Sequence, residues 1–335
     1  MKKVIITGGA GYIGSHTVVS LYRNGFLPVI VDNFSNSHKI IIHNLSKYLN
    51  FSYQFVNLDC SNIFSVDPTE VCGIIHFAAC KSVGESVSRP LWYYKNNLES
   101  LLWVLNYIQT NKINNFVFSS SCTVYGRPEY VPVDEGHKIT SSPSPYGQTK
   151  VICERIIDDW KKNFEDVNVC NLRYFNPIGA MPQVPIGEYP KQEPENLVSR
   201  LMNYASGKGM FCIHGNDYDT HDGSAVRDYL DVGDLANSHV EVLKYMEGKK
   251  GIYKKYNVGT GKGTSVFELV NTFKKISGLN DLQISVGPKR EGDIDRIYGD
   301  ASLLHEDIGY KCFTSMETSL ENAWKWQKYI NENNN

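Results

Sequence analysis

The first half of the chain alternates short runs of apolar, often β-branched residues with longer stretches in which apolar residues recur at helical spacing. Polar or glycine-rich residues bound each short run, and the stretches between runs are too long for hairpins. The pattern predicts a doubly wound parallel sheet with helices on both faces, a Rossmann-type α/β fold. The predicted strands are 3–7, 28–32, 53–57, 73–78, 115–120 and 167–175, and the predicted helical stretches are 11–25, 38–49 and 89–111.

This rhythm breaks after residue 176. Residues 176–197 read NPIGAMPQVPIGEYPKQEPENL, a segment dense in proline, glycine and polar residues that is typical of a long surface excursion. Beyond it, strand-like and helix-like patterns are mixed. We therefore expect a Rossmann domain over residues 1–176 and a second, smaller mixed α/β lobe over 177–335, with some of its segments returning to the first domain.

Composition narrows the class of partner. Of 335 residues, 41% are hydrophobic and 21% are charged, as in ordinary globular proteins. The net charge of −2 gives no electrostatic reason to expect nucleic acid or a membrane surface as a partner, and no apolar run approaches the roughly 20 residues of a membrane helix. The eight cysteines form no CxxC pair, so reduced thiols in a cytoplasmic protein are expected, with no metal site.

A glycine-rich turn directly follows the first predicted strand. Gly9, Gly11 and Gly14 satisfy GxGxxG, and Gly8, Gly11 and Gly14 satisfy the related GxxGxxG. Glycines allow the backbone to approach a pyrophosphate closely, and the helix that follows offers free N–H groups to the anion. A tight turn without a ligand is the alternative, but the strand before and the helix after favour a dinucleotide cradle.

Asp32 ends the second predicted strand. In this fold a carboxylate at that position accepts hydrogen bonds from the adenosine ribose hydroxyls. Its charge would repel the 2′-phosphate of NADP, so the expected cofactor is NAD.

Tyr146 and Lys150 lie four residues apart in SPYGQTK, after two prolines that indicate the start of a helix. At this spacing both side chains project from one helix face, where an ammonium group favours the phenolate over a phenol whose ordinary pKa is about 10. Ser119, Ser120 and Ser121 lie at the carboxyl end of a predicted strand, where ligands of such sheets collect. An isolated YxxxK is usually a surface pair, but beside these features it predicts proton transfer coupled to hydride transfer.

Several segments match, in order, the motifs of one enzyme family. They are TGGAGYIGSH, Asp32-Asn33, HFAACKSVGES, YYKNN, FSSSCTVYG, SPYGQTK, LRYFNPIGA, GNDYDTHDGSAVRDY and KREGD. From residue 3 to about residue 328 the chain resembles the UDP-glucose 4-epimerase (UDP-galactose 4-epimerase) family of the extended short-chain dehydrogenase/reductase superfamily. The resemblance implies C4 oxidation of a UDP-hexose by tightly bound NAD, rotation of the 4-keto sugar, and return of the hydride to its opposite face.

The resemblance also implies roles for individual residues. Tyr146 is the implied base, Lys150 lowers its pKa and binds the nicotinamide ribose, and Ser121 assists proton transfer. Thr123 would contact the sugar or the phosphate chain. The implied cofactor contacts are Gly8, Gly11, Tyr12, Ile13, Gly14, Asp32, Asn33, Asn36, Ser37, Asp59, Cys60, Phe77, Lys81, Asn96, Ser119, Tyr146, Lys150 and Phe175.

Because the sugar must turn while the nucleotide stays fixed, binding energy should be concentrated on the UDP. Arginines suit a diphosphate because they offer paired, charged donors, although a salt bridge to the adjacent Asp228 is an alternative for Arg227. The implied anchors are Asn176, Asn196, Leu197, Arg227, Arg290 and Asp293.

Three positions depart from the family pattern. His214 stands where a phenylalanine is usual near the uracil, and Cys212 replaces a small residue beside it. Ile297 occupies the position that is Tyr in some members and Cys or Ser in members accepting N-acetylated sugars. A branched aliphatic side chain there should hinder a 2-acetamido group. A UDP-GlcNAc/UDP-GalNAc 4-epimerase is nevertheless kept as the alternative function.

Two further alternatives differ in chemistry. A nucleotide-sugar 4,6-dehydratase would need an acid pair beside the catalytic hydroxyl, but residues 121–125 read SCTVY. A non-catalytic NAD-binding scaffold would retain the fold alone, although the intact Tyr146, Lys150 and Ser121 argue against it. The family also pairs through the helix predicted at 89–111, which implies a homodimer.

Overall fold

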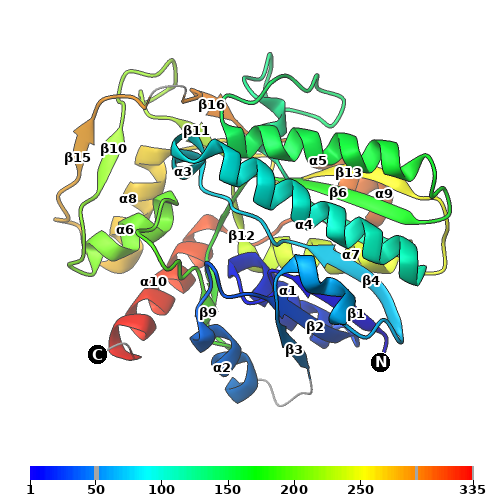
Figure 1. The fold of residues 1–335 in the computed structure, drawn as a ribbon. Coiled ribbons are helices and arrows are strands. Elements are labelled where there is room, and N and C mark those ends of the chain that lie inside the picture. The colour runs from blue at the N-terminus through cyan, green and yellow to red at the C-terminus, as the bar shows by residue number, and fades with distance from the viewer. Residues whose placement is uncertain (49–52, 291–292, 334–335) are drawn as a thin grey trace.

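A computed structural model describes residues 1–48, 53–290 and 293–333 and contains a central sheet of seven parallel strands. The strand order is β13, β6, β5, β4, β1, β2, β3, which confirms the predicted doubly wound fold (Figure 1). The strands are β1 (Lys3–Thr7), β2 (Leu27–Asp32), β3 (Gln54–Asn57), β4 (Val71–His76), β5 (Asn115–Ser121), β6 (Asn168–Tyr174) and β13 (Tyr253–Val258).

Helices cover both faces of this sheet (Figure 1). Alternate residues of β1 belong to two different hydrophobic layers, one on each face of the sheet. Val4 and Ile6 belong to one buried cluster, and Ile5 belongs to the other. On the side of Val4 lie α1 (Tyr12–Arg23), α2 (Lys39–Tyr48) and α7 (Val232–Met246), and on the side of Ile5 lie α4 (Pro90–Asn111) and α5 (Pro145–Lys161).

Strand β13 was not among the predicted strands. Its sequence, YKKYNV, places two lysines in its middle, which is unlike a strand buried on both faces. It lies at the edge of the sheet, where β6 is its one partner among the described strands, so its polar side chains can reach solvent. The C-terminal half of the chain thus contributes both a strand and helix α7 to the sheet layer.

The strand order reverses between β1 and β4, whose carboxyl ends lie side by side. The backbone N–H of Phe77, just after β4, donates to the carbonyl oxygen of Thr7 at 3.0 Å. In open α/β sheets, ligands bind in the crevice at this reversal. The glycine turn follows Thr7, so it lies at this crevice.

A separate hydrophobic cluster joins helices α6 (Leu197–Ala205), α8 (Val266–Ser277) and α10 (Met316–Asn333). Four small sheets accompany it: β10 with β15, β12 with β7, β8 with β9, and β14–β11–β16. Their bounds are β7 (Asn176–Ile178), β8 (Ala180–Met181), β9 (Ile186–Gly187), β10 (Cys212–His214), β11 (Val226–Arg227), β12 (Tyr229–Asp231), β14 (Thr264–Ser265), β15 (Ser285–Gly287) and β16 (Arg296–Ile297). The remaining helices are η1 (Cys60–Ser65), α3 (Val83–Ser88), η2 (Cys122–Tyr125) and α9 (Ser302–Ile308).

All eight cysteines carry free thiols, and Cys60, Cys122, Cys153 and Cys170 are buried. Among the helices of the described residues, none is both long and apolar enough to cross a membrane.

The buried thiols predict alkaline unfolding. Burial raises the pKa of Cys60, Cys122, Cys153 and Cys170 from 9.0 to about 12. Because the folded-state pKa is the higher one, this stability is fully present below pH 9 and is lost as the pH rises toward 12. Each thiol should remove about 1.4 kcal/mol of unfolding free energy per pH unit in that window.

We expect the urea midpoint to be nearly constant between pH 7 and 8 and to fall steeply between pH 9 and 10. Cys170→Ala should make the unfolding free energy fall less steeply with pH in this window, by the contribution of one thiol. An unfolding free energy that is independent of pH across 9–10 would contradict the assignment of buried, protonated thiols.

Candidate active site

The glycine turn after β1 brings two strand ends and a helix into close contact. Gly8 has a φ of +72°, in the left-handed region, and a Cβ there would lie 2.9 Å from the backbone nitrogen of Ala78. A Cβ on Gly14 would overlap the carbonyl oxygen of Gly8. Gly11 precedes α1 as its N-cap, and no side chain of the described residues caps the helix. The first-turn N–H groups therefore remain available to an anion, as a pyrophosphate cradle requires.

Asp32 is buried beside this turn at the end of β2. Its Oδ2 accepts a hydrogen bond from the backbone N–H of Ala10 at 3.0 Å. Its Oδ1 accepts from the backbone N–H of Phe34 at 2.8 Å and from the Ser37 hydroxyl at 2.7 Å. These bonds hold a carboxylate at the glycine turn.

The next predicted cofactor residues surround Asp32. The Asn33 amide donates to Asp59 Oδ2 at 2.9 Å, and both residues are exposed, as is Asn36. Cys60 is buried behind Asp59, with its thiol in hydrogen-bond contact with Thr7 of β1. The structure thus brings the predicted residues of β2 and η1 to one edge of the sheet.

The ends of β4 and β5 supply a second group. The Phe77 ring packs 4.7 Å from the ring of His239, measured between centroids, and Ser119 is hydrogen-bonded to Tyr174 through its hydroxyl. On α4 the Asn96 amide donates to Asn97 Oδ1 at 3.1 Å.

Asn97, which the sequence analysis missed, connects this group to α5. Its side chain accepts from the backbone N–H of Cys80 at 2.8 Å and donates to the Cys80 carbonyl at 3.0 Å. It also donates to the Thr149 hydroxyl at 3.1 Å. The loop after β4 is therefore fixed relative to helix α5.

Helix α5 begins as the SPYG segment predicts. The Ser144 hydroxyl, at the N-cap, accepts from the backbone N–H of Gly147 at 3.1 Å, and Pro145 occupies the first helical position. Tyr146 is half-buried and Lys150 is buried one turn later. Both side chains are brought to the carboxyl end of β5.

Lys150 Nζ lies 5.9 Å from the centroid of the Tyr146 ring and donates to the carbonyl oxygen of Ser119 at 2.7 Å. The Ser121 hydroxyl is in hydrogen-bond contact with the Tyr146 phenol and accepts from the backbone N–H of Thr123 at 3.2 Å. The predicted phenol, ammonium and strand-end hydroxyl therefore form one cluster.

Burial dominates the protonation of this cluster. It raises the pKa of Tyr146 to about 12, although the Ser121 hydrogen bond acts in the opposite direction. Burial also lowers the pKa of Lys150 to about 8. The protein's own groups thus favour a neutral phenol. The expectation that Lys150 by itself lowers the pKa of Tyr146 is therefore not fulfilled.

A buried ion pair ties α5 to the sheet behind the cluster. Glu154, one turn after Lys150, accepts from Arg173 Nε at 2.9 Å and from Arg173 Nη2 at 2.6 Å. It also accepts from the Ser120 hydroxyl at 2.6 Å. Because Ser120 lies between Ser119 and Ser121, this network positions the helix relative to the strand end.

Thr123 and Phe175 lie near the cluster on its other sides. The Thr123 hydroxyl is buried and has no hydrogen-bond partner among the described residues. A Cβ on Gly147 would lie 3.1 Å from Thr123 Cβ, so this hydroxyl is close to the start of α5. The Phe175 ring is buried against Gly299, where a Cβ would overlap it. The unpaired hydroxyl suits a ligand that offers a polar group.

The C-terminal half supplies charged groups of both signs. Arg227 Nη2 lies 2.6 Å from Asp293 Oδ1, and the Tyr218 hydroxyl donates to Asp293 Oδ2 at 3.0 Å. Asp228 is buried and instead accepts from the Thr260 hydroxyl at 2.6 Å. The alternative of an Arg227–Asp228 salt bridge is therefore wrong.

His214 lies near two arginines. Burial lowers its pKa, and the charges of Arg290 and Arg200 lower it further. Cys212 lies two residues earlier on β10, where a Cβ on Gly287 would be 2.9 Å from its sulfur. Residues 291 and 292 of the KREGD segment lie outside the described residues.

Asn176 and Ile297 approach the Arg227 group through small sheets. The backbone N–H of Asn176 donates to the carbonyl oxygen of Asp228 at 3.0 Å. Ile297 is buried on β16, directly opposite Arg227 in the strand register.

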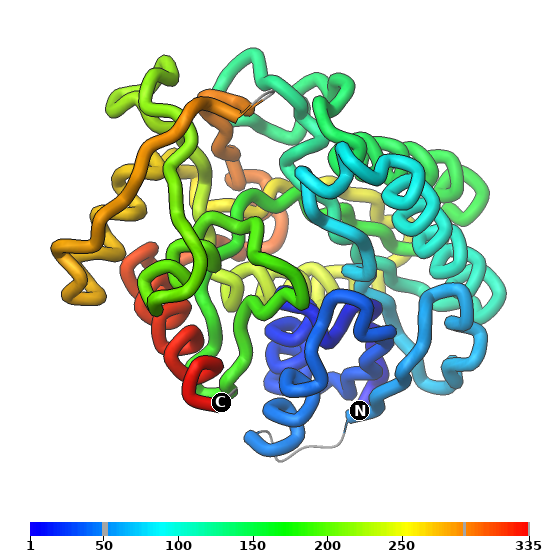
Figure 2. Tube along the Cα trace, turned by 60° about the vertical axis from the view of Figure 1, so that its left-hand side comes forward, coloured from blue at the N-terminus to red at the C-terminus, as the bar shows by residue number. Residues whose placement is uncertain are grey.

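We call residues 182–196 the 182–196 segment. It lies between α2 and α10 (Figure 2). Asn44 of α2 donates to the carbonyl oxygen of Pro185 at 2.6 Å, and Trp326 Nε1 of α10 donates to that of Glu188 at 2.9 Å. Glu188 joins two predicted site residues: its Oε1 accepts from Lys81 Nζ at 2.6 Å and from Asn196 Nδ2 at 2.5 Å. Leu197 follows as the first residue of α6.

The sequence analysis missed Glu188, Arg200 and Tyr218. The proline- and glycine-rich segment around Glu188 has no periodicity that would assign its side chains to a face. Arg200 and Tyr218 meet their partners only through tertiary contacts. In the part of the chain that the structure describes, no group of three or more His, Cys, Asp or Glu side chains could hold a metal ion.

The geometry agrees with comparisons to known proteins. A family model for the "NAD dependent epimerase/dehydratase family" matches residues 4–259. A UDP-glucose 4-epimerase from Dictyostelium discoideum is 40% identical over 330 residues, covering 97% of this chain and 95% of that protein.

Two solved structures are similar over nearly the full length. A UDP-glucose 4-epimerase from Stenotrophomonas maltophila, with bound NAD and formylated UDP-arabinopyranose, has a TM-score of 0.94 at 35% identity and covers 99% of this chain and 100% of that chain. A UDP-glucose 4-epimerase from Bifidobacterium longum, in complex with NAD+ and UDP, has a TM-score of 0.92 at 35% identity, with 98% of each chain covered.

Proposed function

Because the chain belongs to the NAD dependent epimerase/dehydratase family, we propose that it interconverts UDP-glucose and UDP-galactose by C4 epimerisation, with NAD as its tightly bound cofactor. The observation that carries the proposal is the cluster of Tyr146, Lys150 and Ser121, at the same carboxyl edge of the sheet as the glycine turn. Residues 121–125 read SCTVY, so the strand-end hydroxyl of Ser121 is followed by no carboxylate. That environment favours reversible proton transfer over the elimination of water.

The cradle fits a dinucleotide. Gly8 and Gly14 allow the turn to pack tightly, since a Cβ at either position would meet backbone atoms, and Asp32 holds a carboxylate where the adenosine ribose would lie. We assign the cofactor's binding to these residues, together with the β2, β4 and β5 strand ends described above. Bound there, NAD would supply the hydride acceptor and donor for C4 and a positive charge that would favour the Tyr146 phenolate.

Proton transfer falls to residues of the chain itself. Tyr146 takes the proton of the sugar C4 hydroxyl and later returns it, with Ser121 hydrogen-bonded to the phenol throughout. Lys150, held by the Ser119 carbonyl, is assigned to the nicotinamide ribose, and formation of the phenolate depends on the charge of the bound cofactor. The unpaired Thr123 hydroxyl offers a hydrogen bond to the substrate.

The UDP is anchored away from the reacting sugar. Arg227 and Arg290 supply cationic donors for the diphosphate, and Asn176, Asn196 and Leu197 supply polar and backbone groups. We assign His214 and Cys212 to the uracil. Since these contacts hold only the nucleotide, the keto sugar is free to rotate.

The test is direct. Protein purified without added cofactor should interconvert UDP-glucose and UDP-galactose, and denaturation should release NAD. A protein that carries NAD but forms neither sugar would favour the non-catalytic scaffold. Formation of a 4-keto-6-deoxy sugar would favour a dehydratase.

Substrate breadth gives a separate prediction. Ile297 is buried opposite Arg227, so its side chain limits the space near the substrate anchors. Ile297→Cys should raise kcat/KM for UDP-GlcNAc by about tenfold or more, because one or two methylene-sized groups in a pocket are worth roughly 1–3 kcal/mol each. Both substrate pairs should be assayed on each protein.

Ile308→Cys is the matched control, since Ile308 is half-buried on α9. It should leave the preference unchanged. Wild-type protein that accepts UDP-GlcNAc as well as UDP-glucose would refute Ile297 as the limit.

We also propose a homodimer formed through α4. Leu91, Trp92, Leu102 and Trp103 expose 83%, 45%, 45% and 40% of their surface on this helix. Such an apolar stripe favours a partner of the same kind. Light scattering after gel filtration should give twice the chain mass, and Trp103→Glu should give the monomer.

A further inference from the structure

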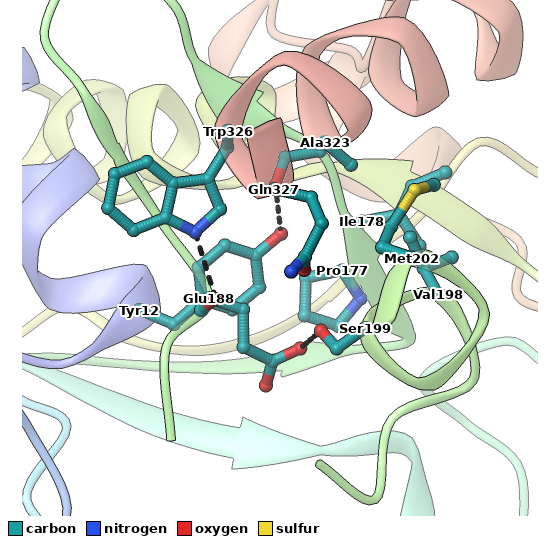
Figure 3. A pocket seen from close by; sticks show the side chains of 11 residues that line it. Tyr12, Pro177, Ile178, Glu188, Val198, Ser199, Met202, Ala323, Trp326 and Gln327 are labelled. Carbon is teal, nitrogen blue, oxygen red and sulfur yellow. Dashed lines mark hydrogen bonds between the residues drawn. The ribbon is translucent and has the colours of Figure 1, made fainter. Parts of the chain in front are cut away.

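Glu188 is an acid that the proposed reaction does not use, yet it is among the most highly bonded side chains of the 182–196 segment. Its side chain is only 12% exposed. Besides the bonds from Lys81 and Asn196, its second oxygen accepts a hydrogen bond from the Ser199 hydroxyl (Figure 3). A buried carboxylate needs this many partners, but Lys81 belongs to the proposed cofactor contacts and Asn196 to the proposed UDP anchors.

One side is the cofactor side. Lys81 follows β4, and its ammonium lies 5.9 Å from the centroid of the Tyr12 ring in the first turn of α1. The Tyr12 hydroxyl donates to the carbonyl oxygen of Gly179 at 2.8 Å. Lys81 and Tyr12 therefore connect Glu188 to the glycine turn.

The other side is the nucleotide side. Asn196 is the N-cap of α6, but among the described residues its side chain makes no capping hydrogen bond. Its amide is directed to Glu188 instead. Ser199, in the first turn, holds the second carboxylate oxygen, so Glu188 fixes the start of α6.

The backbone of Glu188 is fixed independently. Its carbonyl accepts from Trp326 of α10, and a Cβ on the preceding Gly187 would overlap the Trp326 ring (Figure 3). Burial raises the pKa of Glu188, but the Lys81 ammonium and the two hydrogen bonds outweigh burial and hold the pKa below its ordinary value. The carboxylate is therefore charged at neutral pH.

We infer that Glu188 is a positioning residue that couples retention of NAD to binding of the UDP moiety, because it holds Lys81 and the start of α6 on one carboxylate. This inference rests on the proposed function. This bridge gives a change at either side a route to the other, and the coupling must be reciprocal for the two affinities.

The test measures binding and not turnover. NAD release is followed by diluting the protein into an NAD-consuming dehydrogenase assay, with and without saturating UDP, and the UDP dissociation constant is measured by calorimetry. In the wild type, UDP should slow NAD release by at least about fivefold, the lower range of typical coupling. In Glu188→Gln, NAD release should be faster and the effect of UDP should fall to less than about twofold.

Glu193→Gln is the matched control, since Glu193 is an exposed acid of the same segment. It should behave as the wild type. If Glu188→Gln does not fold, Lys81→Met removes the same ion pair from its exposed end and should also abolish the coupling. Coupling that persists in the folded variant, or that is absent from the wild type, overturns the inference. Wild-type protein that binds neither NAD nor UDP overturns the proposed function itself.

Discussion

Tyr146→Phe should lower kcat for UDP-galactose epimerisation by about 10³-fold, within the range that positioned acid–base groups contribute. The substitution removes only the phenolic oxygen. The Ser121 hydroxyl is too weak an acid and base to replace it, and residues 121–125, which read SCTVY, supply no carboxylate. KM should change little, because the anchors proposed for the substrate lie on the UDP.

The same preparation should retain its full content of NAD, which separates lost chemistry from lost cofactor. Tyr130→Phe is the control, because Tyr130 is 48% exposed and its hydroxyl donates to Asp134 Oδ2 at 3.0 Å. It should leave kcat unchanged. Tyr146→Phe with full activity would eliminate Tyr146 as the base.

Arg173→Leu should lower the free energy of unfolding by about 3–5 kcal/mol, measured by urea denaturation at pH 7. Arg173 is 1% exposed and Glu154 is 2% exposed. Removing the guanidinium leaves a buried carboxylate whose remaining partners are Ser120 and Lys255, with Lys255 Nζ at 3.6 Å. The epimerase rate should fall as well, because Glu154 also fixes Ser120 beside the proton-transfer cluster.

A double substitution distinguishes pairing from packing. Glu154→Leu combined with Arg173→Leu removes both charges, so it should recover part of the loss. Lys162→Met breaks an exposed ion pair with Asp159 and should leave stability unchanged within error. A single Arg173→Leu variant as stable as the wild type would refute the stabilising role of the pair.

The sequence predicted the sheet well because its central strands have a strong local signal. Continuous apolar runs such as KVIIT mark strands buried on both faces, and their position changed by at most two residues in the structure. The edge strand β13 lacks that signal. Its lysines are compatible with an edge but also with a loop, so only pairing with β6 identifies it.

The site residues that belong to short sequence motifs were predictable. The glycine turn, Asp32 and the Tyr146–Lys150 pair each occupy a spacing with a physical meaning. Glu188 and Asn97 act through partners that are distant in sequence, Lys81 and Thr149 among them. The protonation state of Tyr146 was not predictable from the sequence either, because its pKa depends on burial that local spacing does not encode.

The edge position of β13 also has a consequence for synthesis on the ribosome. Strand β6 ends at Tyr174, but β13 begins only at Tyr253, and α7, which covers one sheet face, begins at Val232. Until those segments emerge, the nascent sheet has an open edge beside β6, and the part of the apolar face that α7 covers is exposed. The proton-transfer helix α5 is therefore made well before the layer opposite it is complete, and the growing chain needs protection from association during that interval.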